Sequence, residues 1–332
     1  MDKKGNNIGV DVDSKFLVCK CCRGEQSYPI KTFSNDPVGH RKFIRWATQR
    51  GQSARVCMES TGVYSLLFAM ALDAAEGIEV AVVNARAIKK FAEASLQRGK
   101  TDAMDAAMIM EYLIRMPFRA WQAPASETLE LQLLTRRVIQ LNAEFTRENN
   151  RHHAAKRMGG HGRLIANDTA VNMRHLERRV KILEGEIAAL IASIPVMQEK
   201  LNQLQSITGI ADKTGPRILA ELIGLPKDMS AKQWVAYVGL DPRPNESGSS
   251  IYKPRRISKQ GNRYLRNALF FPALVASQKD KHIRAYYLHL IERGKKPKQA
   301  LIAIMRKLLL AIWAMFQNGQ YWQAEKFYKI VE

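Results

Sequence analysis

The sequence predicts an α/β domain followed by a mostly helical region. Two observations carry this prediction: short apolar runs alternate with helical stretches in the first third of the chain, and helical periodicity dominates after it. At 332 residues the chain has room for about two domains of ~150 residues. Its composition, 46% hydrophobic and 25% charged, is that of a globular protein and excludes a chain that is disordered throughout.

The first part of the chain alternates strands and helices. Apolar, β-branched runs at 8–12, 16–22 and 26–33 are separated by polar breaks and predict three neighbouring strands. The elements expected next are a helix over 37–50, a strand over 54–58, a helix over 63–75, a strand over 79–83 and a helix over 101–115. We therefore expect a mixed α/β domain over residues 1–124.

Two heptad seams follow and predict a helical hairpin over residues 125–197. The first seam consists of Leu131, Leu134, Val138, Leu141 and Phe145, and the second of Leu176, Val180, Leu183, Ile187, Leu190 and Ile194. The glycine-rich stretch 159–163 between them is where the chain can reverse. Such seams can close within one chain or between two, and a plain helical spacer is the alternative to a coiled coil that joins subunits.

Charge is concentrated in the last region, residues 198–332. The chain has a net charge of +21, and between residues 245 and 307 it carries 15 Lys and Arg against three acidic residues. This asymmetry favours contact with nucleic acid.

Because no stretch approaches ~18 uninterrupted apolar residues, we expect no membrane association and a bacterial cytoplasmic location. The four cysteines, at positions 19, 21, 22 and 57, are expected to be reduced thiols on strands.

Four carboxylates are candidate metal ligands. Asp11 lies within an apolar strand, Glu59 ends another, and Asp102 and Asp105 are three residues apart on one helix face. Each also has an ordinary interpretation as a solvated or helix-capping acid. Two acids on strands and a pair on a later helix occur in the order in which an RNase H-like nuclease fold assembles a metal site. Four oxygen donors suit Mg²⁺ or Mn²⁺, and Asp13 is a possible additional ligand.

A serine-containing loop precedes the basic segment. Residues 241–250 form a polar stretch in which serines commonly form turns, but Gly248 would also allow a phosphodiester to approach closely. Five basic residues follow and can hold phosphates: Arg255, Arg256, Lys259, Arg263 and Arg266. A serine in this loop is well placed to act as a nucleophile. Upstream, residues 204–215 are similar to a helix-hairpin-helix that presents backbone N–H groups to DNA.

Five motifs, in this order, carry a resemblance to a known family. They are residues 9–15 (GVDVDSK), 59–64 (ESTGVY), 100–106 (KTDAMDA), 239–250 (GLDPR followed by ESGSS) and 257–266 (ISKQGNRYLR). Together they resemble the IS110 insertion-sequence transposases, also called DEDD recombinases, which include the Piv-type DNA invertases. The chain departs from the family at Asn84, which lacks the proline that commonly follows it, but no catalytic position is affected.

The resemblance implies a fold, a site and partners. It implies a RuvC-like RNase H domain over 1–124, a coiled-coil connector over 125–197 and a C-terminal transposase domain over 198–332, assembled as dimers of dimers. Asp11, Glu59, Asp102 and Asp105 match the metal-binding tetrad, and Ser247 matches the nucleophile, with Ser249 and Ser250 as second choices. In many members a bridge RNA pairs with donor and target DNA.

The expected activity is recombination through a 5′-phosphoserine intermediate, assisted by Mg²⁺. One alternative is a metal-dependent nuclease such as a junction resolvase, which activates water and leaves hydrolysed ends. A second is a protein-only DNA invertase that needs no guide RNA, and a third is a non-catalytic scaffold for nucleic acid. The sequence leaves open which basic residues contact RNA or DNA, and whether the active site forms within one chain or between chains.

Overall fold

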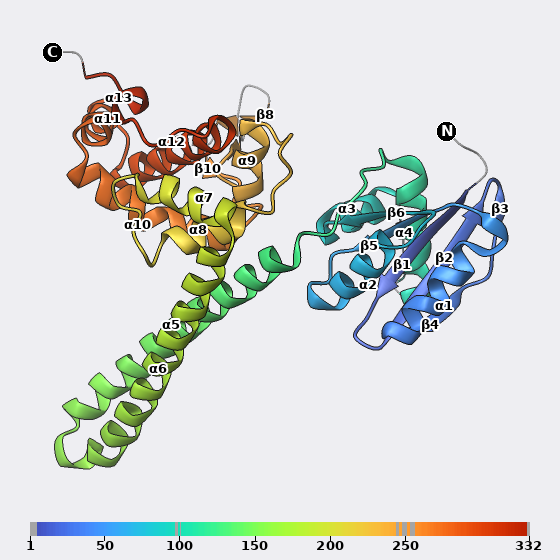
Figure 1. Cartoon of the computed structure of the whole chain (residues 1–332), viewed down its shortest axis with the longest axis horizontal. Helices are drawn as coiled ribbons and strands as arrows, with labels where there is room; N and C mark the ends of the chain where they lie inside the picture. Colours follow the sequence, from blue (N-terminus) through green and yellow to red (C-terminus); the bar gives the residue numbers. More distant parts are fainter. Residues whose placement is uncertain are drawn as a thin grey trace. The chain divides into compact units, whose positions relative to one another are not determined.

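The computed structural model describes residues 5–96, 99, 101–243, 246–247, 251–252 and 256–330. The chain forms two compact units, Met1–Ala123 and Pro124–Glu332, which Figure 1 colours from blue to green and from green to red. The first is built on a mixed β-sheet and the second consists mainly of helices. Both features confirm the prediction of an α/β domain followed by a mostly helical region.

The sheet of the first unit has the order β3-β2-β1-β5-β6, with β4 pairing with β2 beside β3. Its strands are β1 (Asn6–Val12), β2 (Phe16–Arg23), β3 (Gln26–Ser27), β4 (Lys31–Ser34), β5 (Ala54–Glu59) and β6 (Ile78–Val83). β1 and β2 are antiparallel, whereas β1, β5 and β6 run parallel to one another. The single strand predicted over 26–33 was wrong: Pro29, which has no N–H to donate, separates the two short strands β3 and β4.

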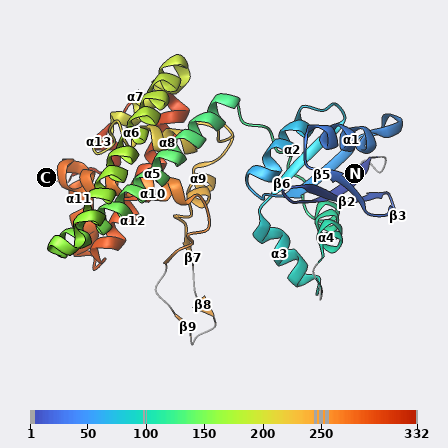
Figure 2. The same cartoon turned by 90° about the horizontal axis from the view of Figure 1, so that it is seen from below.

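Helices cover both faces of this sheet, as Figure 2 shows. They are α1 (Pro37–Ala47), α2 (Val63–Asp73), α3 (Ala85–Ala94) and α4 (Asp102–Arg115), with a 3₁₀ turn over Gln49–Gly51. Phe43 of α1 and Phe68 of α2 pack with Ile8 and other residues on one face. Residues of α3 and α4 pack with Cys57 on the other. The sequence analysis missed α3, which begins where the Asn84 side chain accepts a hydrogen bond from the N–H of Arg86.

The second unit begins with a long helical hairpin. α5 (Ser126–Arg157) and α6 (Arg163–Ser193) lie side by side and are joined by a 3₁₀ turn over Gly159–Gly162, where the sequence predicts a reversal. Leu131 and Val138 of α5, with Ile187 and Ile191 of α6, belong to the same core as the helices that follow. Figure 1 shows the remainder of the hairpin extending beyond those helices. The two helices of the hairpin pack on each other within one chain, and a coiled coil that joins subunits stays a prediction.

Short and long helices complete the second unit around one core. They are α7 (Pro195–Gln205), α8 (Gly215–Leu222), α9 (Ala231–Val238), α10 (Arg263–Lys279), α11 (Lys281–Glu292), α12 (Pro297–Asn318) and α13 (Ala324–Phe327). Within the described part of the chain, α12 alone is long and apolar enough to cross a membrane, with a mean hydropathy of 1.6 over its most apolar window. Here Ile304, Leu308 and Ile312 of α12 are fully buried in the helical core.

Candidate active site and nucleic-acid interface

The parallel pairing of β1 and β5 brings two of the predicted ligands to one end of the sheet. Gly9 is in register with Cys57, and Val10 with Met58. Asp11 and Glu59 are the next residues of these strands, and both side chains are half-buried. Because side chains alternate along a strand, Asp11 and Glu59 project from the same face as Cys57, which packs against α3 and α4.

Gly9 lets α4 approach that face closely. A Cβ at Gly9 would lie 2.2 Å from the backbone nitrogen of Met110 and 2.3 Å from the carbonyl oxygen of Ala106. Asp105 directly precedes Ala106, and Asp102 begins the helix, whose first turn is capped by the Thr101 hydroxyl accepting from the N–H of Met104. The two aspartates therefore lie on the first turn of a helix that packs on the Asp11 face of the sheet.

The four carboxylates share one face without closing into a metal-binding cluster. Asp105 is half-buried and Asp102 is exposed. Over the residues that the structure describes, which include all four acids, no three His, Cys, Asp or Glu side chains are close enough together to hold a metal ion. The donor set nevertheless fits Mg²⁺ or Mn²⁺ chemically, since both ions prefer carboxylate oxygens.

Asp13 has a structural role in the turn between β1 and β2. Its Oδ2 accepts from the N–H of Lys15 and from the hydroxyl of Ser14, both at 3.3 Å. Hydrogen bonds from the backbone of Ser14 and Lys15 hold the pKa of this exposed carboxyl below its usual value. The Asn35 amide donates to the carbonyl oxygens of Asp13 and Tyr64, which ties the turn to α2. Asp13 as a metal ligand stays a prediction.

The loop after Glu59 holds a polar group that the sequence analysis missed. The N–H of Ser60 donates to the carbonyl of Val83, and the N–H of Thr61 donates to the Ser65 hydroxyl. The Thr61 hydroxyl oxygen is itself buried, and the described residues offer it no hydrogen-bond partner. A buried hydroxyl without a partner is rare in folded proteins, and this one lies two residues from a candidate ligand, Glu59. The motif ESTGVY contains the residue, but nothing in its pattern indicates burial.

Ser247 lies in a region of short antiparallel strands rather than in a structureless loop. β7 (Pro242–Arg243) pairs with β10 (Arg256–Ile257), and β8 (Glu246–Ser247) pairs with β9 (Ile251–Tyr252), so that the backbone of Ser247 is opposite Ile251. At the base of β7 and β10, the Ser258 hydroxyl donates to Asp241 Oδ1 over 2.5 Å. The predicted residues Gly248, Ser249, Ser250 and Arg255 lie outside the described residues.

The predicted phosphate-binding residues differ in how far their side chains are exposed to solvent. Arg256, Lys259 and Arg263 are exposed, and Lys259 adopts a left-handed backbone conformation with φ of 54°. Arg266 is half-buried, and its Nη1 donates to the carbonyl of Val238 over 2.7 Å. Arg256, Lys259 and Arg263 thus present cationic groups to solvent, although the Arg263 guanidinium also donates to the Tyr264 hydroxyl over 3.2 Å. Arg266 anchors the end of α9.

A buried ion pair that the sequence analysis did not single out joins α5, α8 and α10. Arg136 donates to both carboxylate oxygens of Glu221 at 2.8 Å, and Glu221 is 2% exposed. This carboxylate raises the pKa of the Arg136 guanidinium. The Asn262 amide, at the start of α10, donates to Glu221 over 2.6 Å and to the Tyr237 hydroxyl over 2.9 Å. The one sequence signal was a single acid in the otherwise apolar run 218–223.

Residues 206–214 connect α7 to α8 within the stretch for which a helix-hairpin-helix is predicted. Gly209 in this turn has φ of 95°, and a Cβ there would lie 2.8 Å from the carbonyl oxygen of Pro272 in α10. Gly209 is therefore required for packing inside the unit. Contact between this turn and DNA stays a prediction.

All four cysteines are free and buried, three on β2 and Cys57 on β5. Burial raises the pKa of Cys21 to about 11 and that of Cys57 to about 12. A thiol with so high a pKa is not a nucleophile at neutral pH. The buried thiols of Cys21 and Cys57 are therefore not candidates for the nucleophile.

Two models of transposases match the chain in sequence order. The first, a DEDD transposase of the IS110 type, matches residues 8–155, and the second, described as transposase IS116/IS110/IS902 family, matches residues 201–288. The first match includes all four candidate carboxylates, and the second includes Ser247 and the basic segment. These matches define the class of the protein as a transposase, a DNA-processing enzyme.

Curated relatives agree with this class over nearly the whole chain. A pilin gene-inverting protein of Moraxella bovis is 28% identical over 318 residues, which cover 94% of this chain and 96% of the relative. An insertion element IS900 protein of Mycobacterium paratuberculosis is 26% identical over 93% of this chain and 95% of its own length. A protein of insertion element IS116 from Streptomyces clavuligerus is 24% identical over 95% of this chain and 93% of its own length. The chain belongs to the IS110 family of transposases.

Proposed function

We propose that Asp11, Glu59, Asp102 and Asp105 form the metal-binding tetrad of a RuvC-like catalytic domain. The observation that carries this proposal is the pairing of β1 with β5 and the packing of α4 on Gly9, which put all four carboxylates on one face of the sheet. The ion is Mg²⁺ or Mn²⁺, which would neutralise phosphate charge and favour ionisation of an attacking hydroxyl.

Ser247 is the nucleophile in this proposal. Its Oγ attacks a DNA phosphorus and loses its proton, the bond to the 3′ oxygen breaks, and that oxygen takes up a proton. The products are a 5′-phosphoserine and a free 3′-hydroxyl. Because one phosphodiester replaces another, a 3′-hydroxyl from a second strand can reverse the step and join DNA without ATP. Strand exchange without net hydrolysis is the expected outcome.

The proposed partners are donor DNA, target DNA, a bridge RNA and further copies of the chain. The exposed Arg256, Lys259 and Arg263 supply phosphate contacts, and Arg255 and Arg266 extend this set. Exposed apolar residues on the hairpin, such as Leu164 at 82% and Ile165 at 59% exposure, support its use as a contact between copies in a dimer or tetramer. The reaction takes place in the bacterial cytoplasm.

A protein-only DNA invertase is the second candidate, and a specific observation favours it. The relative from Moraxella bovis, which the match covers over 96% of its length, is named for inverting a pilin gene. In this case the same serine and carboxylates act, but the protein itself recognises the DNA sites.

Recombination assays with and without RNA separate these functions. Purified protein with Mg²⁺ and labelled donor and target DNA should give joined strands rather than hydrolysed ends. Loss of joining when the element's non-coding RNA is omitted supports a guide, and joining without RNA supports the invertase. Hydrolysed ends that persist in Ser247→Ala would instead establish a water-using nuclease and overturn the proposal.

A further inference from the structure

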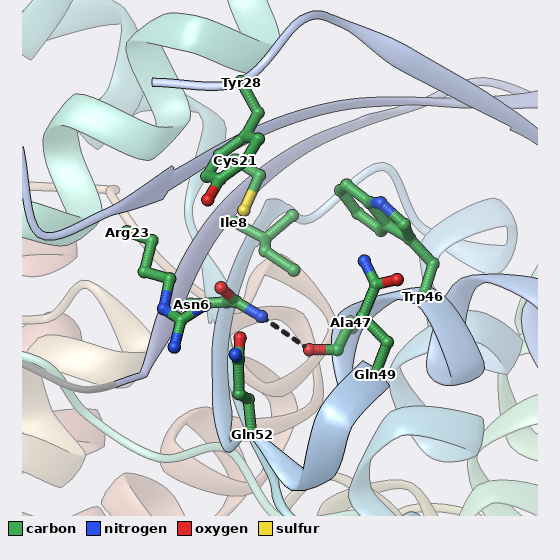
Figure 3. A pocket seen from close by; sticks show the side chains of 9 residues that line it. All are labelled: Asn6, Ile8, Cys21, Arg23, Tyr28, Trp46, Ala47, Gln49 and Gln52. Carbon is green, nitrogen blue, oxygen red and sulfur yellow. Dashed lines mark hydrogen bonds between the residues drawn. The ribbon is translucent and has the colours of Figure 1, made fainter. Parts of the chain in front are cut away.

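A small polar pocket opens in the first unit between the start of β1, the end of β2 and the end of α1. Its volume is about 170 Å³. Figure 3 shows the side chains around it, which include three amides, two aromatic rings and one guanidinium: Asn6, Gln49, Gln52, Tyr28, Trp46 and Arg23. Among the residues that the structure describes, no carboxylate lines the pocket. Its lining therefore favours a neutral or anionic ligand with both donors and acceptors.

The pocket is separate from the candidate active site. Asn6 and Ile8 line it from the face of β1 that packs on α1 and α2, whereas Asp11 projects from the opposite face. Asn6 is also at the opposite end of the strand, roughly 17 Å from Asp11 along β1. A ligand in the pocket would not contact the metal-binding carboxylates.

Of the three amide side chains, that of Asn6 is held in place by a hydrogen bond. Asn6 is 7% exposed, and its Nδ2 donates to the carbonyl of Ala47 over 2.8 Å, the dashed line in Figure 3. Gln49 is exposed and Gln52 half-buried, and within the described part of the chain neither side chain makes a hydrogen bond that would compete with a ligand. Amide side chains donate and accept at once, as the edges of nucleobases do.

We propose that this pocket binds one unpaired base of a single-stranded nucleic acid. The amides of Gln49 and Gln52 bond the base edge, Tyr28 and Trp46 supply ring surface, and Arg23 meets an adjoining phosphate. The volume is below the roughly 300–1,000 Å³ of pockets for larger ligands, so it suits a single ring system. Exposed Arg41, Lys42 and Arg45 on the neighbouring helix α1 add positive charge for the backbone.

Photocrosslinking of the full-length protein tests this proposal. The probes are single-stranded RNA containing 4-thiouridine and single-stranded DNA containing 4-thiothymidine, each also in duplex form. We expect the single-stranded probes to crosslink to peptides that contain Tyr28 or Trp46, and the duplexes to do so far less. The probe that crosslinks identifies the source of the base as RNA or DNA, and either result supports the binding of a base in the pocket.

Variants make the test specific. Replacing Gln49 and Gln52 together by Ala should lower crosslinking at this peptide about five- to tenfold, as expected for the loss of two or so hydrogen bonds. Gln122→Ala, at an exposed glutamine of the same unit, should leave it unchanged. Arg23→Gln provides a second variant if the double variant melts at a lower temperature.

Three results would overturn the base-binding pocket. They are crosslinks that map only to other peptides, equal crosslinking by duplex probes, and yields that neither the double variant nor Arg23→Gln changes. Crosslinking requires no strand cleavage, so its outcome is independent of Ser247 and of the proposed recombination chemistry.

Discussion

At the scale of single residues, Gly9 decides how close α4 comes to the candidate ligands. Its missing side chain allows the α4 backbone at Ala106 and Met110 to lie against β1. Since Asp11 is two residues further along the same face, any displacement of α4 also moves Asp102 and Asp105 away from Asp11. The site therefore depends on a residue that carries no functional group.

We predict that Gly9→Ala destabilises the first unit by about 1–3 kcal/mol or more, as overpacking of a core does. The reason is that the new methyl group would meet two backbone atoms within 2.3 Å, which cannot move without shifting α4. Urea denaturation followed by circular dichroism measures the change.

Gly185→Ala is the matched control. Gly185 lies within α6 and has open space around it, so the added methyl group should stabilise the protein by about 0.5–1 kcal/mol. Equal stability of Gly9→Ala and the natural protein would show that α4 does not pack on Gly9 as described.

At the scale of elements, α1 carries a buried histidine, His40, close to the turn between β1 and β2. His40 is 7% exposed, and its Nε2 is 2.9 Å from Asn35 Oδ1. Burial lowers the pKa of His40 below 6.5, although the nearby Asp36 acts in the opposite direction. Asn35 also bonds the carbonyl of Asp13, so the histidine supports the turn that follows the Asp11 strand.

We predict that the first unit loses stability as the pH falls below about 6.5. Because the folded pKa of His40 is depressed, the unfolded chain binds the proton first, and stability is fully present above that pH and declines below it. Urea midpoints at pH 7.5 and 5.5 measure the loss. His40→Gln keeps an amide near Asn35 and should show a smaller difference between the two pH values; an unchanged difference would rule His40 out as the cause.

The sequence predicted most elements of the first unit and both long helices. Its errors have physical reasons: α3 is only 10 residues long and buries a single side chain, that of Ile88, so little apolar sequence marks it. Glu221 appeared to be an ordinary acid because its partners, Arg136 and Asn262, are 85 and 41 residues away in the chain. Register between β1 and β5, which brings Asp11 beside Glu59, likewise depends on contacts between distant residues.

At the scale of the whole molecule, the net charge of +21 dominates encounters with nucleic acid. We predict that DNA binding weakens steeply with salt, with a slope that falls by about one for each phosphate contact removed. Arg256, Lys259 and Arg263 are exposed, so replacing all three by Gln should reduce the slope by up to about three. Fluorescence anisotropy with a labelled duplex at several salt concentrations measures it.

Arg266→Gln separates the loss of a positive charge from the loss of a hydrogen bond that stabilises the fold. Arg266 Nη1 bonds the carbonyl of Val238, so this variant should lower the melting temperature more than the exposed substitutions do. A salt slope that the triple substitution leaves intact would place the phosphate contacts elsewhere on the chain.

The central claim is that Ser247 becomes covalently attached to DNA with the help of the carboxylates that include Asp11. The most direct test is mass spectrometry of the protein after reaction with Mg²⁺, RNA and a nicked DNA substrate. The short fragment that ends in the released 3′-hydroxyl diffuses away from this substrate, so that the covalent intermediate is trapped. We expect a nucleotide adduct on the peptide that contains Ser247, absent from both Ser247→Ala and Asp11→Asn. Cleaved DNA with an adduct on no serine, or an adduct that survives Ser247→Ala, would contradict it.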